Sequence, residues 1–331
     1  MRTLVVAGLV TAVTTLGMWS QPVWSCAADT FWRDTLRCQL FPADTPPPAP
    51  IDPATPADIK HFTRVDLPWR NQGFEVVRCV DGTRPVIYVD EAQSASNRWV
   101  FTFQGGGSCA SGQACLGTYL DLGERGEMST ARKPAMRNMP GIHTPDAVNG
   151  FRDYHRVRIE KCGYDRYNGN ATVRGAAATV DSDLDGDGIQ GEVINDPTGL
   201  AVQEGADLGF DLFHHGKKIM LHTLDELRDG LRYDTWVAAS GGVTEVFATL
   251  PPLKDADAIL FAGHSGGAHG LMNNIDSLAD YMAGWTRTDG TPFDADVRAL
   301  FDAHLLPTLE SEAAFNEHLN RSEERRVGKE C

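Results

Sequence analysis

The sequence predicts an α/β protein with a mostly parallel sheet flanked by helices. Three observations support this: strand-like apolar runs, amphipathic helical runs, and glycine-rich turns that join one kind to the other. The strand-like runs are rich in Val, Ile, Phe or Tyr or are short and apolar, and they cover residues 85–90, 98–103, 155–160 and 257–262. Helical runs, with apolar residues three or four positions apart, cover residues 216–228, 267–282 and 294–304.

The composition is that of a globular protein. The chain has 331 residues, of which 42% are hydrophobic and 23% charged, so it is long enough to bury a sizeable core. Its formal net charge of −15 argues against nucleic acid as a partner, because phosphate backbones bind basic surfaces. After the first thirty residues, no apolar run is long enough to predict a transmembrane segment.

Residues 1–25 are expected to be a signal peptide. Arg2 gives the positive start, an apolar stretch follows, and small residues lead to a cut before Cys26 or after Ala27. The protein is therefore predicted to be secreted or periplasmic, where disulfides form. A lipoprotein anchored through Cys26 is the alternative, although Trp24 fits that motif badly.

The last eleven residues, 321–331, reverse-translate to a common sequencing-adapter sequence. We therefore expect the natural sequence to end near Asn320 and to be cut short there. The predicted organisation is a signal peptide, a proline-rich N-terminal segment at 26–57 and an incomplete domain at 58–320.

The cysteines predict a disulfide framework in an exported protein. Leaving out the tail, they are Cys26, Cys38, Cys79, Cys109, Cys115 and Cys162. Three bridges can form if Cys26 survives processing. Cys109 with Cys115 would close a short loop, as would Cys26 with Cys38, but the sequence leaves the connectivity open.

Ser265 is the candidate nucleophile. Residues 263–267 read Gly-His-Ser-Gly-Gly, which fits G-x-S-x-G, with a strand-like run before it and a helical run after it. The glycines allow a tight turn that projects the serine hydroxyl, and the following helix start offers free backbone N–H groups. His264 and His269 are close in sequence, and we expect them to be structural or to line the pocket.

A second glycine run supports this interpretation. Gly105, Gly106 and Gly107 directly follow the strand-like run 98–103. A glycine loop after an early strand can bring backbone N–H groups to a substrate carbonyl and supply half of an oxyanion hole.

These pieces resemble the pectin acetylesterase/Notum family of α/β-hydrolase carboxylesterases. The similar stretches occur in family order and lie at residues 99–109, 159–169, 213–219, 262–267 and 297–303. Three positions depart from the family pattern: Gln104 replaces Glu, Ser108 replaces Trp and Gly266 replaces Ala.

The resemblance implies an α/β-hydrolase-like fold and acyl transfer. Ser265 would attack an ester carbonyl while the N–H groups of Gly106, Gly107 and Gly266 hold the oxyanion. The family's catalytic Asp and His lie well after the serine, and only 55 residues separate Ser265 from Asn320. We therefore expect both to be missing, and this chain to be inactive or weak. No triad role is assigned to the acidic residues and histidines that are present, Asp294, Asp296, Asp302, His304 and His318.

An acidic loop predicts a structural Ca²⁺ site within an insertion at 174–208. The candidate ligands fit the pattern D-x-D-x-D-G-x₅-E and are Asp181, Asp183, Asp185, Asp187 and Glu192. A second register, D-x-D-x-D-G, starts at Asp183. The alternative is a solvated acidic loop without a cation.

The function predicted is a secreted serine carboxylesterase that removes acetyl or other acyl groups from polysaccharide esters. Two alternatives stay open: a noncatalytic, calcium-dependent glycan-binding protein on a hydrolase fold, and a serine peptidase of the same fold. They differ in whether Ser265 reacts and in which bond is cut.

Overall fold

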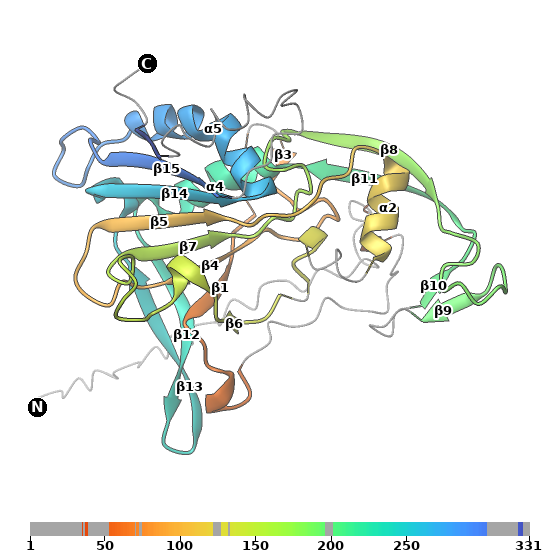
Figure 1. The fold of residues 1–331 in the computed structure, drawn as a ribbon, viewed down its shortest axis with the longest axis horizontal. Coiled ribbons are helices and arrows are strands. Elements are labelled where there is room, and N and C mark those ends of the chain that lie inside the picture. Colours follow the sequence, from red (N-terminus) through yellow and green to blue (C-terminus); the bar gives the residue numbers. More distant parts are fainter. Residues whose placement is uncertain are drawn as a thin grey trace, which may run out of the picture.

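The fold is an α/β-hydrolase-like arrangement built on one mixed sheet (Figure 1). The computed structural model describes residues 35, 37–38, 53–69, 71–72, 75–121, 127–131, 133–195, 201–302 and 324–326. Its eight-stranded sheet has the order β16-β15-β14-β5-β7-β4-β1-β6. These strands are β1 Phe62–Asp66, β4 Val86–Asp90, β5 Arg98–Phe103, β6 Met136–Arg137, β7 His155–Ile159, β14 Ala258–His264, β15 Asp296–Asp302 and β16 Glu324–Arg326.

The remaining strands form two-stranded hairpins: β2 Asn71–Gln72 with β3 Glu75–Val76, β8 Ala171–Thr179 with β11 Asp207–His214, β9 Val193–Asn195 with β10 Ala201–Gln203, and β12 Leu231–Ala239 with β13 Gly242–Leu250. The α-helices are α2 Gly112–Leu120, α4 Gly216–Arg228 and α5 Gly266–Ala283. Short 3₁₀ turns are η1 Pro56–Asp58, η2 Gly141–His143 and η3 Leu253–Asp255.

The four central strands are parallel, and antiparallel strands extend the sheet on both sides. β7, β5, β14 and β15 run in the same direction, whereas β4, β1 and β6 add antiparallel neighbours beyond β7. The carboxyl ends of β5 and β14 therefore meet at one edge, the usual place for a site in such sheets. The strands expected at 85–90, 98–103, 155–160 and 257–262 are confirmed.

One predicted helix is wrong. The segment expected to be helical at 294–304 is strand β15 as far as the structure describes it, and it pairs in parallel with β14. Val297 and Ala299, two positions apart, are both buried in the core, and a period of two residues is that of a strand. The three-residue spacing of Val297 and Leu300 imitated a helix, because periodicity over a short segment is ambiguous.

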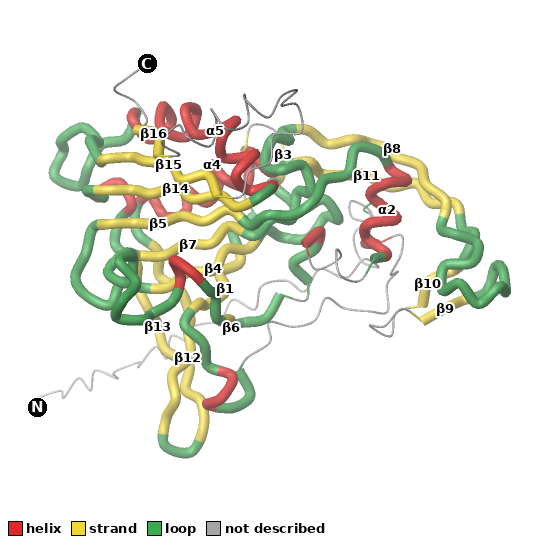
Figure 2. Tube along the Cα trace, viewed as in Figure 1, coloured by secondary structure: helices red, strands yellow, loops and turns green. Residues whose placement is uncertain are grey.

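Helices α4 and α5 cover one face of the sheet, and both predicted helices are confirmed (Figure 2). Helix α5 contacts β14, β15 and β5. The buried sides of both helices share one core with the strand face that carries Phe101 and Phe261, two rings whose centroids lie 5.2 Å apart. This packing fixes the point at which β14 passes into α5.

Two long hairpins project from the sheet (Figure 1). Strands β12 and β13 form one of them, and β8 with β11 forms the other, which ends in the small hairpin β9–β10. A second core cluster joins the β8–β11 hairpin to α2 and contains Leu116, Phe210 and Leu212. The predicted insertion 174–208 thus includes the outer part of this arm.

Several sequence predictions lie outside the described residues. They include the signal peptide 1–25, most of the proline-rich segment 26–57 and most of 321–331. None of the helices in the described ranges is long and apolar enough to cross a membrane.

Candidate active site

Ser265 lies at the junction of β14 and α5 in a strained backbone conformation. Its φ of 49° and ψ of −119° are costly for a residue with a side chain, and such strain clusters at functional sites. Its N–H donates to the Asp302 carbonyl at 3.1 Å, and its own carbonyl accepts the His269 N–H at 3.1 Å. The side chain is exposed, and its hydroxyl makes no hydrogen bond to a described residue. The turn therefore presents a free hydroxyl at the end of the central strand.

The glycine loop after β5 lies beside this turn. Its ends are fixed, because the Gln104 N–H donates to the Ile159 carbonyl at 3.2 Å and the Cys109 N–H donates to the Tyr164 carbonyl at 3.1 Å. Between them, the N–H groups of Gly106 and Gly107 make no hydrogen bond to the part of the chain that the structure describes. Two free donors next to an exposed serine are what an oxyanion hole requires.

The glycine loop 105–107 is in van der Waals contact with the turn that carries Ser265. A Cβ on Gly266 would collide with the carbonyl oxygen of Gly106, so Gly266 must lack a side chain for the two backbones to come this close. Gly106 itself has a φ of 129°, which only glycine adopts readily. The N–H of Gly266 is in the first turn of α5, where helical N–H groups lack intrahelical partners. The structure thus brings Ser265, Gly106, Gly107 and Gly266 together.

A buried lysine, Lys161, makes a hydrogen bond to the backbone of the glycine loop. Lys161 is 1% exposed, donates from Nζ to the Gly107 carbonyl at 3.0 Å and pairs with Glu127 at 2.8 Å. Its Nζ also lies 4.1 Å from the ring centroid of Tyr164, close enough for a cation–π contact. Gln104 accepts the Lys161 backbone N–H at 3.1 Å. Sequence reasoning missed Lys161 and Glu127, because a charge pair 34 positions apart leaves no local pattern.

The segment after β7 carries a second cluster of strained residues. Tyr164, Arg166 and Tyr167 have φ values of 50°, 52° and 60°. Asp165 stabilises this turn by accepting N–H groups of Tyr167 at 2.9 Å and Gly216 at 2.8 Å. Burial raises the pKa of Asp165, and these two hydrogen bonds oppose the shift.

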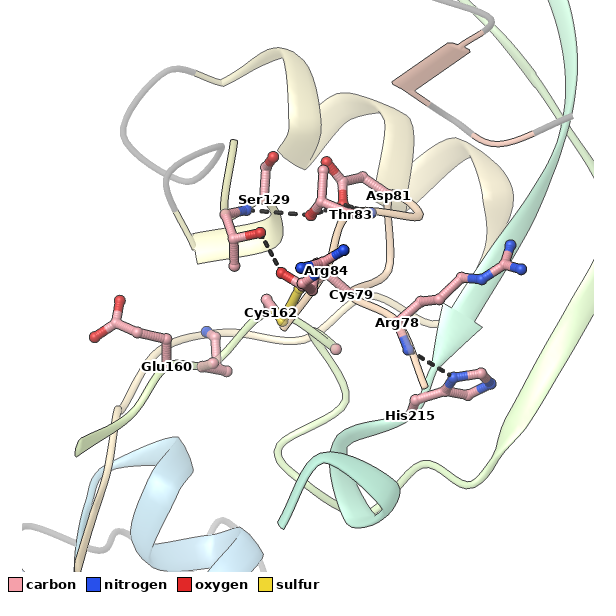
Figure 3. The surroundings of a disulfide bond; sticks show 12 residues. Arg78, Cys79, Asp81, Thr83, Arg84, Ser129, Glu160, Cys162 and His215 are labelled. Carbon is pink, nitrogen blue, oxygen red and sulfur yellow. Dashed lines mark hydrogen bonds between the residues drawn. A yellow bond between two sulfur atoms is a disulfide. The ribbon is translucent and has the colours of Figure 1, made fainter. Parts of the chain in front are cut away.

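Two disulfides brace the ends of the site, and Figure 3 shows the surroundings of one of them, Cys79–Cys162. Cys79 is bonded to Cys162, just after β7, with a Cα separation of 4.7 Å. Cys109 is bonded to Cys115 and ties the end of the glycine loop to α2, which confirms the expected short bridge. Cys38 is also disulfide-bonded, but Cys26, one of its possible partners, lies outside the described ranges.

Polar side chains surround the Cys79–Cys162 disulfide (Figure 3). The Arg78 N–H donates to Nδ1 of His215 at 3.2 Å, and Thr83 accepts the Thr130 N–H at 3.2 Å. Glu160 is fully buried. Burial alone would raise its pKa, but Lys133, Arg158 and Arg137 outweigh this and lower the pKa of Glu160.

Within the described residues, His264 and His269, which are close to Ser265 in the sequence, do not form a triad with it. Nδ1 of His264 lies 3.8 Å from Oδ2 of Asp302, and these side chains are 64% and 76% exposed. Burial, followed by the charge of Arg166, lowers the pKa of His269. Among the described residues, neither histidine makes a hydrogen bond to the Ser265 hydroxyl.

Of the other residues without an assigned triad role, two acidic residues form surface ion pairs and two histidines lie outside the described residues. Asp294 pairs with Arg287 at 2.8 Å, and Asp296 pairs with Arg298 at 2.9 Å. His304 and His318 lie outside the described residues.

The acidic loop brings most of its predicted ligands together. One group contains Asp185, Asp187 and Glu192, and a second contains Asp183, Asp185 and Glu204. Asp181 is in neither group, and its Oδ1 accepts the Asp183 N–H at 3.2 Å. Glu204 was missed by sequence reasoning, since it follows the motif by twelve residues.

Comparison with known proteins places these features in a family. The sequence model of the family described as pectinacetylesterase matches residues 70–244, which include the glycine loop and end before Ser265. No curated protein gives a match.

Two solved structures of the Wnt deacylase Notum from Drosophila are similar to the chain. Crystal form II shares 19% identity, with a TM-score of 0.48, over 73% of this chain and 53% of that one. Crystal form I shares 18% identity, with a TM-score of 0.46, over 78% of this chain and 57% of that one. The chain thus spans a little over half the length of these structures. Because the family match covers 175 of 331 residues (70 to 244), the chain belongs to the pectinacetylesterase family.

Proposed function

We propose that this protein is a carboxylic ester hydrolase with Ser265 as its nucleophile. One observation carries the proposal: the strained Ser265 presents an unbonded hydroxyl directly beside a glycine loop with two free N–H groups. Membership in the pectinacetylesterase family supports the same reaction class. A structural turn has no need to combine backbone strain, an exposed serine and unpaired donors at one place.

The reaction is acyl transfer in two steps. Oγ of Ser265 attacks the ester carbonyl carbon, and its proton passes to a general base, the role that a histidine fills in serine hydrolases. The N–H groups of Gly106, Gly107 and Gly266 stabilise the negative oxygen of the tetrahedral intermediate. The intermediate expels the alcohol, and water then attacks the acyl-serine to release the acid. Each oxyanion donor contributes roughly 10²–10³-fold in kcat.

The substrate proposed is an acetylated or otherwise acylated polysaccharide. Notum is described as a Wnt deacylase, so an acyl group on a protein is the second ester to test. We also propose that the protein acts outside the cytoplasm, which the two disulfides of the described chain support.

The test measures acetate release by the full-length protein from acetylated pectin, with p-nitrophenyl acetate as a second substrate. Ser265→Ala is expected to lose at least about 10³-fold in kcat. Ser240→Ala, in the exposed turn between β12 and β13, serves as the matched control and keeps its rate. Hydrolysis by Ser265→Ala at the rate of the control contradicts the proposal.

Two further experiments, run beside the acetate assay, separate the alternatives. Cleavage of peptide substrates without release of acetate identifies a peptidase. Calcium-dependent retention on a glycan column, together with no Ser265-dependent hydrolysis, identifies a binding protein.

A further inference from the structure

Glu204 is a buried acidic residue with an unpartnered carboxylate oxygen. It lies just after β10 and is 2% exposed. Its Oε1 accepts the Leu184 N–H at 2.5 Å, whereas its Oε2 is buried and has no hydrogen-bond partner among the described residues. Burying a carboxylate without compensation is expensive, so such a group needs an explanation.

The carboxylate of Glu204 lies beside two carboxylates of the acidic loop. One carboxylate oxygen each from Asp183, Asp185 and Glu204 lies within 4.8 Å of the others. Ca²⁺ binds oxygen at about 2.3–2.6 Å, so two ligands on opposite sides of the ion are about 5 Å apart. The three oxygens therefore fit around one cation, whereas without it three negative groups repel one another.

The loop backbone keeps these groups in place. Oδ1 of Asp183 accepts the Gly188 N–H at 3.2 Å, and the Glu204 N–H donates to the Glu192 carbonyl at 3.0 Å. Asp181 contributes differently, since its backbone carbonyl accepts the Gly205 N–H at 3.2 Å. Residues 181–192 and the end of β10 thus form one unit.

We propose that Asp183, Asp185 and Glu204 form a Ca²⁺ site that joins the acidic loop to the end of β10. The register starts at Asp183, and Glu204 supplies the ligand from outside the motif. The neighbouring group of Asp185, Asp187 and Glu192 shares Asp185 with this site. A hard, oxygen-only ligand set of this kind suits Ca²⁺.

The ion stabilises the arm made by β8 and β11. Leu184, between the first two ligands, packs against the second core cluster, which also contains Tyr164 from the active-site side and Val202 from β10. Binding would therefore stabilise the β9–β10 end of the arm together with its attachment to the rest of the protein.

The experiment titrates CaCl₂ into chelator-treated full-length protein by calorimetry and records the melting temperature with and without Ca²⁺. Wild type is expected to bind and to melt at a higher temperature in Ca²⁺, because a ligand that binds only the folded state stabilises it. Glu204→Gln is expected to weaken binding by about tenfold or more, since ligand charge sets the affinity of such sites. Its melting temperature without Ca²⁺ should not fall, because the amide oxygen still accepts the Leu184 N–H.

Two further variants keep the test decisive if Glu204→Gln does not fold. Asp185→Asn changes an exposed ligand and should also lose the Ca²⁺-dependent rise in melting temperature. Glu245→Gln, exposed on β13, is the matched control and should retain that rise. The proposal is overturned if wild type shows neither heat nor a melting shift, or if Glu204→Gln and Asp185→Asn bind Ca²⁺ as the control does. Since no ester is present, these results are independent of the proposed hydrolysis.

Discussion

The carbonyl oxygen of Gly106 lies so close to the Cα of Gly266 that no side chain fits at position 266. This contact joins the glycine loop of β5 to the first turn of α5. It also explains a departure of the sequence from its family, in which alanine follows the nucleophile. In this protein, Gly106 and Gly266, which carry two of the three proposed oxyanion donors, are held together by direct backbone contact.

Gly266→Ala is therefore expected to harm the protein, although it restores the residue typical of the family. The new methyl group must push the Gly106 carbonyl away, which costs about 1–3 kcal/mol of stability. The displaced donors should lower kcat by about 10²-fold. Acetate release and urea unfolding measure the two effects. Gly117→Ala on α2, where a Cβ meets nothing within 4 Å, is the control and should be neutral or stabilising. Equal activity of the two variants would show that the contact is not tight.

Lys161 should act as a positioning residue for the glycine loop. Lys161→Met removes the hydrogen bond to the Gly107 carbonyl and leaves Glu127 without this ion pair. We expect kcat to fall by about tenfold while KM stays the same, because the loop stabilises the transition state and not the ground state. Lys254→Met, which loses a surface pair with Asp229, is the control. A loss of stability with kcat unchanged would leave Lys161 a purely structural role.

The two disulfides should differ in their effect on stability. Cys79 and Cys162 close a loop of 83 residues, whereas Cys109 and Cys115 close one of six. Loop-closure entropy then gives upper estimates of about 4.5 and about 2 kcal/mol. Paired Cys→Ala variants, compared by urea unfolding, measure the difference. The Cys109–Cys115 variant is expected to lose more activity than stability, since it frees the end of the glycine loop. The reverse order of stabilities would contradict this account.

Glu160 should make stability depend on pH. Its pKa is lowered in the folded protein from an unfolded value of 4.5 by Lys133, Arg158 and Arg137, which outweigh burial. A lowered pKa stabilises the fold at pH values above 4.5, and this stabilisation is lost as the pH falls through the folded pKa. Glu160→Gln is expected to lose about 3–5 kcal/mol at pH 7. The difference from wild type should shrink below pH 4.5, as measured by unfolding at several pH values. A difference that stays constant with pH would assign the effect to packing, and Glu245→Gln should show no effect.

Local patterns predicted much of the fold. The strands at 98–103 and 257–262 and the helices at 216–228 and 267–282 have long or distinct apolar patterns, and all are present. Strand β15 was mistaken for a helix because its strand character depends on pairing with β14, which a short sequence window does not contain. The antiparallel direction of β4, β1 and β6 likewise depends on strand pairing, which composition does not reveal.

The candidate site was predicted only where its residues are adjacent in sequence. Ser265 and the glycine loop each carry a motif, so their meeting could be expected from two neighbouring strand ends. Lys161, Glu127 and Glu204 act through contacts between distant segments and have no such signal. The structure therefore adds the support of the site and one ligand of the proposed calcium centre.

The central claim is that Ser265 is the nucleophile, and covalent labelling tests it most directly. The full-length protein is treated with a fluorophosphonate, and the modified peptide is identified by mass spectrometry alongside Ser265→Ala and Ser240→Ala. The account predicts one adduct on Ser265, absent in Ser265→Ala and retained in Ser240→Ala. Labelling of a different residue, or hydrolysis that continues in Ser265→Ala, would contradict it.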